Sequence, residues 1–412
     1  MKFMWLRGRL AVLCVGLWPT MGPCGQDPAA GEPAFEFSSG ERVVFLGNTL
    51  VERAQTYAYL ETFLTLLHPD RDLTFRNLGW SGDNVFGHSR SVFDPPEKGF
   101  AQLEAQVRAC APTVVFVSYG TNEAFWGKEG LPRFQDGLAH LLDTLASTAA
   151  RIVIVTPVRR QPAPPPLPDP EPHNQVLALY VEALANAAKQ RGHRFVDLFT
   201  KLVRAPGEPP LSENTLHLTA FGYWKRATVV LKELGYVPTP LAMEITRAGV
   251  STPSSLSLRT SDFAFGRDAV SFRATSPRLP PIPAPLGNEG TRVRCKGLTP
   301  GRYTLRIDDT PIVTATATEW SEGVTISKGG GLETVEEIRQ RSIRKNFLYF
   351  HRYRPANWPY LLGFRKHEQG NNAAELPHFD PLIQDAERAI AVGRRPSSHY
   401  YRLSRYAEGD SR

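Results

Sequence analysis

The sequence predicts an α/β protein whose first part is a three-layer α/β/α sandwich around a parallel sheet. Two observations lead to this prediction. Between residues 41 and 236, short runs of β-branched residues alternate with stretches whose apolar residues recur at helical spacing. Such alternation builds βαβ units, in which helices cover both faces of a parallel sheet. Beyond residue 236 the alternation stops, and a strand pattern takes over.

The elements of the sandwich follow one another along the chain. Five buried strands are expected at residues 42–46, 73–77, 113–118, 151–156 and 194–198. Apolar residues at helical spacing predict helices around Phe63 and Leu141. Two later helices are expected at residues 173–190 and 219–234. The proline-rich run 161–172 can be neither helix nor inner strand, so it is predicted to be a surface loop.

The second half of the chain is predicted to hold a different kind of structure. Residues 302–308 alternate polar and apolar side chains as a half-buried strand does, and residues 240–327 are expected to form a small antiparallel β module. Residues 334–337 have the pattern of a capping box, which predicts the start of a helix there. Residues 328–412 are therefore expected to be a helical, aromatic C-terminal region.

Composition limits the class of protein. With 412 residues, 42% of them hydrophobic and 22% charged, the chain can bury a large core and form two domains. The formal net charge of +7 is mild, and no nucleic-acid motif is present, so no nucleic-acid partner is expected. Cys110 and Cys295 could pair as a disulfide or remain two separate buried thiols.

The N-terminus predicts export. Three cations, Lys2, Arg7 and Arg9, precede an apolar stretch that is too short to span a bilayer as a stable helix. Residues 1–30 are therefore predicted to be a secretory signal peptide. The mature protein is expected to be secreted or periplasmic, with no integral membrane segment.

Four short blocks carry the chemistry. Gly47-Asn48-Thr49-Leu50 directly follows the apolar run 43–46, which places the Thr49 hydroxyl at the carboxyl edge of the sheet, where open α/β folds build their sites. The other blocks are residues 77–83, 120–123 and 214–217. Together the four resemble the SGNH/GDSL hydrolase family, over residues 41–236. The family has Gly-Asp-Ser in the first block and Asp-x-x-His in the last, so this chain departs from it at Thr49 and Asn214.

The resemblance implies a flavodoxin-like sandwich that hydrolyses esters without a metal or a cofactor. Thr49 matches the position of the nucleophile, His217 that of the base, and Asn214 that of the group that orients the base. Gly82 and Asn122 match the donors that stabilise the oxyanion. Supporting roles are expected for Asn48, Asp83 and Glu213, the last two as carboxylates that could stand in for the missing aspartate.

The two departures leave two functions open. The β-methyl group of threonine crowds an approaching carbonyl carbon, and asparagine cannot supply the charge that stabilises an imidazolium. The chain is therefore either an esterase or acylhydrolase, or a catalytically inactive glycan-binding or scaffolding protein. The expected substrate is a small ester or an acylated carbohydrate, and an O-acetylated carbohydrate is favoured because the C-terminal region is rich in aromatic and polar residues.

The same C-terminal region supplies further candidates. The polar run His367, Glu368 and Gln369 is flanked by aromatic residues and is expected to line the substrate cleft. Phe347, Phe350 and Phe364 are expected to pack against the α/β domain, because aromatic residues at helical spacing are readily buried.

Overall fold

The first half of the chain folds around a five-stranded parallel sheet. The computed structural model describes residues 33–236, 242–252, 258–285, 290–368 and 370–406, so the predicted signal peptide lies outside the described residues. The strands are β1 (Glu41–Gly47), β2 (Leu73–Gly79), β3 (Val114–Ser118), β4 (Arg151–Val155) and β5 (Arg194–Val196). Their order is β2-β1-β3-β4-β5, and every pair is parallel. The five predicted strands and the α/β fold class are confirmed.

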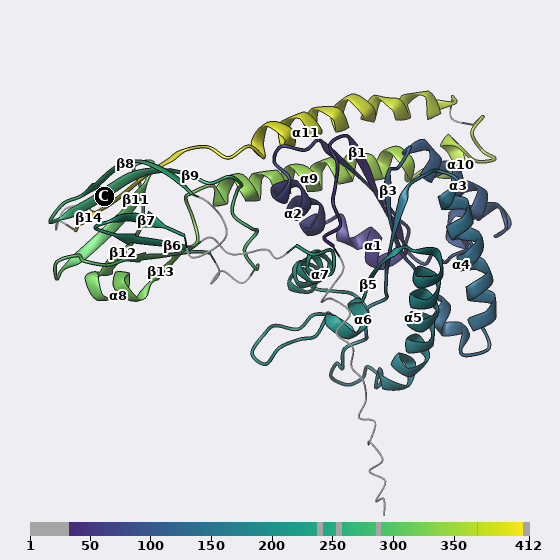
Figure 1. The fold of residues 1–412 in the computed structure, drawn as a ribbon. Helices are drawn as coiled ribbons and strands as arrows, with labels where there is room; N and C mark the ends of the chain where they lie inside the picture. The colour runs from purple at the N-terminus through teal and green to yellow at the C-terminus, as the bar shows by residue number, and fades with distance from the viewer. Residues whose placement is uncertain (1–32, 237–241, 253–257, 286–289, 369, 407–412) are drawn as a thin grey trace, which may run out of the picture. The chain divides into compact units, whose positions relative to one another are not determined.

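Helices cover both faces of this sheet (Figure 1). They are α1 (Thr49–Ala54), α2 (Tyr59–Leu67), α3 (Lys98–Ala109), α4 (Leu131–Ala146), α5 (Glu171–Arg191), α6 (Leu198–Lys201) and α7 (Ala220–Glu233), with short 3₁₀ turns η1 (His88–Ser91) and η2 (Glu123–Trp126). Val43 and the α2 residue Phe63 belong to one hydrophobic core, whereas Val44 and the α4 residue Leu141 belong to another. Successive strand residues thus face opposite layers, as the pleat of a buried strand requires.

A β module with its own core follows. Its strands are β6 (Ala242–Thr246), β7 (Gly249–Ser251), β8 (Arg259–Phe265), β9 (Ala269–Thr275), β10 (Thr291–Cys295), β11 (Arg302–Ile307), β12 (Thr310–Thr316) and β13 (Val324–Ile326), with the short helix α8 (Ala317–Glu322). One sheet has the order β13-β10-β6-β7, and the other has the order β12-β11-β14-β9-β8, in which β14 comprises His399–Arg405. The sheets are antiparallel except for the β6–β10 pair, which is parallel. Trp320, Tyr303 and Phe272 are fully buried in the module's core.

The last described strand corrects the expectation that the C-terminal region is helical to its end. β14 (His399–Arg405) inserts between β11 and β9, antiparallel to both. Tyr401 and Leu403 are buried whereas Arg402 is exposed, which is the alternation of a half-buried strand. The sheet therefore joins residues about 100 positions apart in the β11–β14 pair and about 130 apart in the β9–β14 pair.

The helices between β13 and β14 are α9 (Leu332–Tyr353), α10 (Trp358–Leu361), η3 (Asn372–His378) and α11 (Phe379–Gly393). The predicted start of α9 was late. The helix begins after Gly331, whose φ of +95° ends the preceding turn, and Glu333 accepts a hydrogen bond from the Gly329 N–H at 2.6 Å. Thr334 therefore lies inside the first turn of α9, whose N-cap position is taken by Gly331 without a side-chain cap.

The face that α9 buries also differs from the predicted one. Phe347 is 52% exposed and Phe364 is 75% exposed, so the expectation that they pack inward was wrong, and Phe350 is half-buried. Tyr349 and Tyr353 pack against the α/β core instead, and the Tyr353 hydroxyl donates to the Gly79 carbonyl at 2.8 Å. The buried face of α9 carries Val335, Ile338, Ser342 and Lys345. It is rotated by one residue from the face that was predicted to be buried, which carries Phe347 and Phe350.

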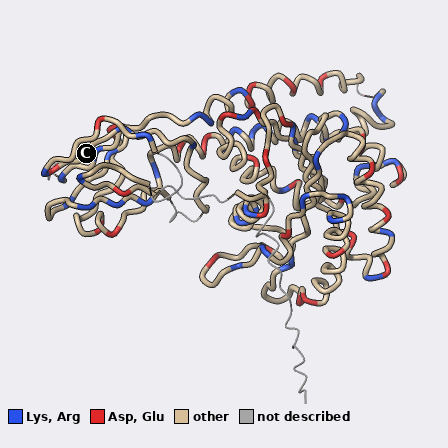
Figure 2. The backbone as a smooth tube through the Cα atoms, viewed as in Figure 1, with Lys and Arg blue, Asp and Glu red and all other residues tan. Residues whose placement is uncertain are grey.

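Lys and Arg are interspersed with Asp and Glu along the described chain (Figure 2). Cys110 and Cys295 are both free thiols, and Cys295 is buried whereas Cys110 is half-buried. Of the two alternatives, a disulfide and two separate thiols, the structure has the separate thiols. No helix in the described part of the chain is long and apolar enough to cross a membrane.

Candidate active site

The first two blocks meet at the carboxyl ends of β1 and β2. Thr49 is the first residue of α1, and Asn48 caps this helix by accepting from the Leu50 N–H at 3.2 Å. Gly82 lies in a left-handed conformation, with φ of +79°. Its N–H donates to Thr49 Oγ1 at 3.2 Å. The structure thus brings the predicted nucleophile and the first predicted oxyanion donor together.

Residues of the second block also hold the helix that carries Thr49. The Asn77 amide donates to the Val51 carbonyl at 2.7 Å. A Cβ on Gly79 would lie 2.1 Å from the Glu52 backbone nitrogen, so only glycine lets α1 pack this closely on β2. This contact fixes the position of Thr49 relative to the sheet.

His217 lies on the loop before α7, and Asn214 fixes its ring. Asn214 Oδ1 accepts from the backbone N–H of His217 at 2.9 Å and from that of Leu216 at 3.4 Å. These two bonds identify the side-chain oxygen, so the amide nitrogen is the atom that faces the ring, 3.3 Å from Nδ1. An amide N–H can only donate, so Nδ1 accepts and the proton of the neutral imidazole is on Nε2.

Two charged groups flank His217. Burial lowers its pKa, Arg53 lowers it further, and Glu213 acts in the opposite direction. Arg53 and Glu213 form an ion pair with their charged atoms 3.4 Å apart. Glu213 also donates its backbone N–H to the His217 carbonyl at 2.8 Å. Of the two carboxylates expected to support the site, Glu213 is thus close to the base but pairs with Arg53.

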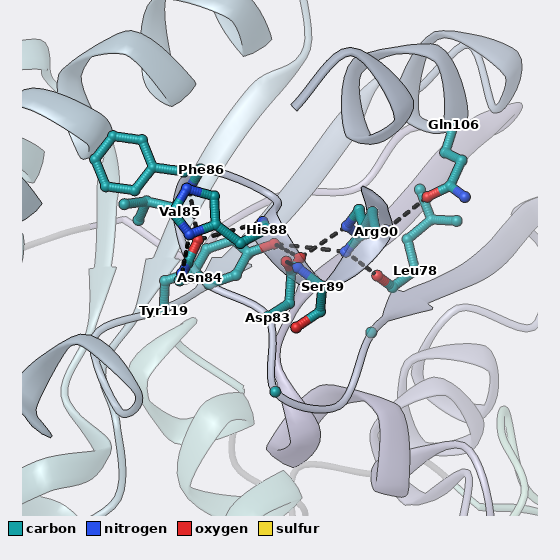
Figure 3. A network of polar contacts seen from close by, with 12 residues as sticks. Leu78, Asp83, Asn84, Val85, Phe86, His88, Ser89, Arg90, Gln106 and Tyr119 are labelled. Atoms are coloured by element: carbon teal, nitrogen blue, oxygen red, sulfur yellow. Dashed lines mark hydrogen bonds and ion pairs between the residues drawn. The ribbon is translucent and has the colours of Figure 1, made fainter. Parts of the chain in front are cut away.

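Asp83, the other expected carboxylate, is engaged elsewhere. Its side chain is fully buried, forms an ion pair with Arg90 at 2.7 Å and accepts from the Tyr119 hydroxyl at 3.0 Å (Figure 3). Arg90 also donates to Gln106 at 2.7 Å and to the Leu78 carbonyl at 2.8 Å. The expectation that Asp83 could replace the missing aspartate was wrong, because this network uses its carboxylate to brace the loop of the second block.

The third block is tied to the same loop. Asn122 donates its amide to the Asp83 carbonyl at 2.6 Å, which leaves its second amide hydrogen free for a substrate oxygen. Glu123 is buried and accepts from the backbone N–H groups of Val85 at 2.9 Å and Gly120 at 2.8 Å. Burial raises the pKa of Glu123 to about 7 despite these bonds. Glu123 therefore links the second block to the third.

A small cavity of about 40 Å³ collects the predicted groups. Its lining includes Asn48, Thr49, Asn122 and His217, which come from three of the four blocks. Among the described residues, no hydrogen bond joins the side chains of Thr49 and His217. Catalytic hydrogen bonds of this kind often tighten only when substrate binds.

A second, larger cavity of about 370 Å³ borders the same loop. It is lined by Glu52, Trp80, Ser89, Val92, Phe350, His351, Arg354, Pro355, Ala356 and Trp358. Ser89 Oγ lies 3.2 Å from where a Cβ on Gly82 would be, so this cavity adjoins the predicted oxyanion donor. The Arg354 guanidinium lies 4.1 Å from the centroid of the Trp80 ring and pairs with Glu52 at 2.5 Å. The sequence interpretation missed Trp80, although it stands next to Ser81 and Gly82.

The polar run of the C-terminal region does not reach either cavity. His367 and Glu368 are exposed and absent from both linings, and Glu368 pairs with Arg365 at 2.5 Å. The expectation that they line the cleft is therefore corrected, because their turn closes on itself. Gln369 lies outside the described residues. Within the part of the chain that the structure describes, no three His, Cys, Asp or Glu side chains gather to hold a metal ion.

Comparisons with known proteins concern the family and the fold of the chain. Residues 46–225 match the GDSL-like lipase/acylhydrolase family. The fold resembles that of a gut microbial diltiazem-metabolizing enzyme, with a TM-score of 0.69 and 16% identity over 90% of this chain and 99% of that one. An acetylxylan esterase from Geobacillus stearothermophilus matches with a TM-score of 0.39 and 20% identity, over 49% of this chain and 99% of its own. No curated protein sequence matches the chain.

Proposed function

The chain belongs, through residues 46–225, to the GDSL-like lipase/acylhydrolase family, and on this premise we propose that it is an exported acylhydrolase with Thr49 as nucleophile. One observation carries the proposal. Thr49 Oγ1 receives the Gly82 N–H at 3.2 Å and shares one cavity with His217 and Asn122. A nucleophile, a base and one oxyanion donor thus border the same space, and the second donor, the Gly82 N–H, contacts the nucleophile, which is the set of groups that acyl transfer to water requires.

In the proposed reaction, Thr49 Oγ forms a bond to the acyl carbon while its proton passes to His217 Nε2. The negative charge moves to the carbonyl oxygen, where the Gly82 N–H and the free Asn122 amide hydrogen stabilise it. The bond to the alcohol then breaks, and the alcohol leaves with the proton from His217. A water molecule repeats these steps on the acyl-threonine and releases the acid.

Asn214 limits the rate of this reaction. Because its amide donates to Nδ1, Nε2 carries the ring proton, and the ring must change tautomer before it can accept the proton of Thr49. In a serine protease, the analogous aspartate-to-asparagine change lowers turnover by roughly 10⁴ through the wrong tautomer. We therefore expect slow hydrolysis.

The larger cavity supports an acylated carbohydrate as substrate. Trp80, Phe350 and Trp358 offer aromatic surface to a sugar ring, and Arg354, Glu52 and His351 offer hydrogen-bonding groups beside it. The cavity volume of about 370 Å³ suits a small ligand. In this arrangement the sugar occupies the larger cavity and its acyl group reaches Thr49.

The Asn214 geometry also favours a second candidate function. If the proton stays on Nε2, the protein binds acylated glycans at Trp80 and Arg354 without cleaving them. A catalytically silent glycan-binding protein would keep both cavities and lose only turnover.

A four-protein series separates the two functions. The parent, Thr49→Ser, Asn214→Asp and the double variant are assayed on p-nitrophenyl acetate and on acetylated xylo-oligosaccharides. We expect the double variant to exceed the parent by at least about tenfold, or about 1.4 kcal/mol of barrier, because the aspartate restores the tautomer. Binding of the acetylated oligosaccharide without turnover in any of the four proteins would establish the silent binding protein instead.

A further inference from the structure

A serine, a histidine and an aspartate are linked by side-chain contacts beside β14, outside the site already described. Ser397 Oγ lies 3.2 Å from His399 Nε2, and His399 Nδ1 lies 2.6 Å from Asp308 Oδ2. Two successive side-chain contacts thus link a hydroxyl, an imidazole and a carboxylate. This is the arrangement that activates a serine nucleophile, and it is recognised by geometry, whatever the fold or the chain order.

The carboxylate is fixed by the hairpin between β11 and β12. Asp308 and Asp309 form its two-residue turn with φ of +48° and +65°, values typical of the type I′ turns that match the twist of the strands. The Asp308 N–H donates to the Tyr400 carbonyl at 2.8 Å, and Asp308 Oδ1 accepts from the Tyr400 N–H at 2.8 Å. Both carboxylate oxygens are therefore held against β14.

His399 is the first residue of β14, and Ser397 lies in the segment just before it. Ser397 and His399 are two residues apart, so an extended backbone places them on the same side. The His399 side chain is 19% exposed, whereas Ser397 is exposed to solvent. The Asp308 side chain is 52% exposed, so the site is open to solvent at the hydroxyl and at the carboxylate, and only the imidazole between them is largely covered.

The protons are arranged as a base requires, in contrast to His217. Burial acts to raise the pKa of Asp308, but the hydrogen bonds from His399 and Tyr400 outweigh it and lower the pKa. Ionised Asp308 can only accept, so Nδ1 of the neutral His399 carries the proton and Nε2 is free to accept from Ser397.

Three glycines border this set of side chains. Gly329, Gly330 and Gly331 all have positive φ and precede α9, a helix of 22 residues. A Cβ on Gly331 would lie 3.9 Å from His399 Nε2, and one on Gly330 would lie 2.7 Å from the Tyr401 hydroxyl. The glycine backbone therefore passes next to the base. Among the described residues, the Gly330 and Gly331 N–H groups make no hydrogen bond.

We propose that Ser397, His399 and Asp308 form a second acyl-transfer site, which hydrolyses small, exposed acyl esters independently of Thr49. Ser397 Oγ bonds to the acyl carbon as its proton moves to His399 Nε2. The alcohol leaves with that proton when its bond to the acyl carbon breaks. Water, losing a proton to His399, then bonds to the acyl carbon, and the bond to Ser397 breaks as His399 returns that proton to Ser397 Oγ and the acid is released. Asp308 is a positioning residue that holds the tautomer.

Covalent labelling tests the proposal on the whole protein. A fluorescent alkyl phosphonofluoridate forms an oxygen–phosphorus bond to an activated serine and releases fluoride, and tryptic peptide mapping locates it. We expect label on the peptide of residues 395–402 in both the parent and Thr49→Ala. Ser397→Ala and His399→Gln should each lower this labelling at least about tenfold, as loss of a nucleophile or its base does. Ser398→Ala, the exposed neighbour, is the matched control and should keep it.

The positioning role of Asp308 has its own readout. Asp308→Asn should slow labelling of Ser397 at an unchanged melting temperature, and Asp308→Glu should restore part of the rate. Label on the peptide that contains Thr49 but not on Ser397 would overturn this proposal while leaving the proposed function intact. Equal labelling of Ser397 in the parent and in His399→Gln would overturn it as well, because the serine would then not be activated.

Discussion

At the scale of single residues, the two departures from the family pattern have unequal consequences. Thr49 keeps a hydroxyl in place and in contact with the Gly82 N–H. Asn214 keeps its hydrogen bonds to the loop but reverses the one to the ring, because its amide donates where a carboxylate would accept. The asparagine therefore sets the protonation pattern of His217, and the threonine only adds a methyl group near the acyl carbon.

The charges beside His217 predict how activity depends on pH. The base must be neutral to act, so activity is lost as pH falls through its pKa. Arg53 lowers that pKa and Glu213 raises it. We expect Arg53→Gln to move the acidic limb of the kcat/KM profile to higher pH, and Glu213→Gln to move it to lower pH. Shifts in the same direction for both variants would show that another group controls the limb.

Glu123 predicts a pH dependence of stability. Its folded pKa of about 7 exceeds the ordinary value of 4.5, so the folded state binds more protons between these pH values. The free energy of unfolding should therefore fall as pH rises from about 4.5 to 7, by at most about 3 kcal/mol from this group. Urea unfolding of the parent and Glu123→Gln at pH 5, 6 and 7 measures it.

The parent must be compared with Glu123→Gln because the titration of His68 changes the free energy of unfolding with pH in the opposite direction. Burial lowers its pKa to about 4, so its contribution to stability rises with pH over part of the same range. We expect the advantage of the parent over Glu123→Gln to shrink steadily toward pH 7. A constant difference between the two proteins would mean that Glu123 titrates normally.

At the scale of elements, continuous apolar runs were enough to predict the five parallel strands, because a strand that is buried on both faces carries apolar residues at successive positions. The phase of α9 was not predictable in this way. Phe347, Tyr349, Phe350 and Tyr353 occur on several sides of the helix, and polar residues mark its buried stripe. Ser342, Lys345 and Asn346 are buried because they meet polar partners, which a hydrophobic pattern does not reveal.

The ion pair between Lys345 of α9 and Glu61 of α2 predicts a large effect on stability. Both side chains are buried, and Lys345 also donates to the Phe75 carbonyl at 3.1 Å. Lys345→Met leaves the Glu61 charge buried with only Asn346 as a partner, so we expect a loss of about 3–5 kcal/mol in urea unfolding.

Two further variants control for other effects of this substitution. Lys345→Met combined with Glu61→Gln should lose less than Lys345→Met alone, because the stranded charge is gone. Arg344→Met, at the exposed neighbouring position, should change stability by no more than about 0.5 kcal/mol. A loss in the double variant as large as in the single one would assign the cost to packing rather than to charge.

At the scale of the whole molecule, the chain forms separate hydrophobic cores, and the core of the β module shares no residue with the two cores of the α/β domain. The sequence predicted the sandwich and the module but not β14, because the strand has only two buried apolar residues among charged ones. For the same reason the set of Ser397, His399 and Asp308 was not predictable. It depends on the register of β14 against β11, which joins residues 91 positions apart.

A core residue of β14 tests whether the module unfolds by itself. Leu403 is 2% exposed, so Leu403→Ala should cost about 2–5 kcal/mol. Hydrogen exchange should locate the loss, with faster exchange in β9 and β11 and unchanged protection in β1 and β3. Arg402→Ala, on the exposed side of the strand, should leave all four strands unchanged. Equal acceleration in β1 and β3 would show that the two parts unfold as one.

The central place of β14 also sets an order of events during synthesis. The partners of this strand, β11 and β9, leave the ribosome about 100 and about 130 residues before it does. Until residues 399–405 emerge, β9 and β11 each present an unpaired edge to the nascent chain and to its neighbours. The parallel sheet of the α/β domain has no such delay, because all its strands precede residue 197. The module therefore completes its folding after the domain that carries Thr49, and during that interval it is the part of the chain most exposed to aggregation and to proteases.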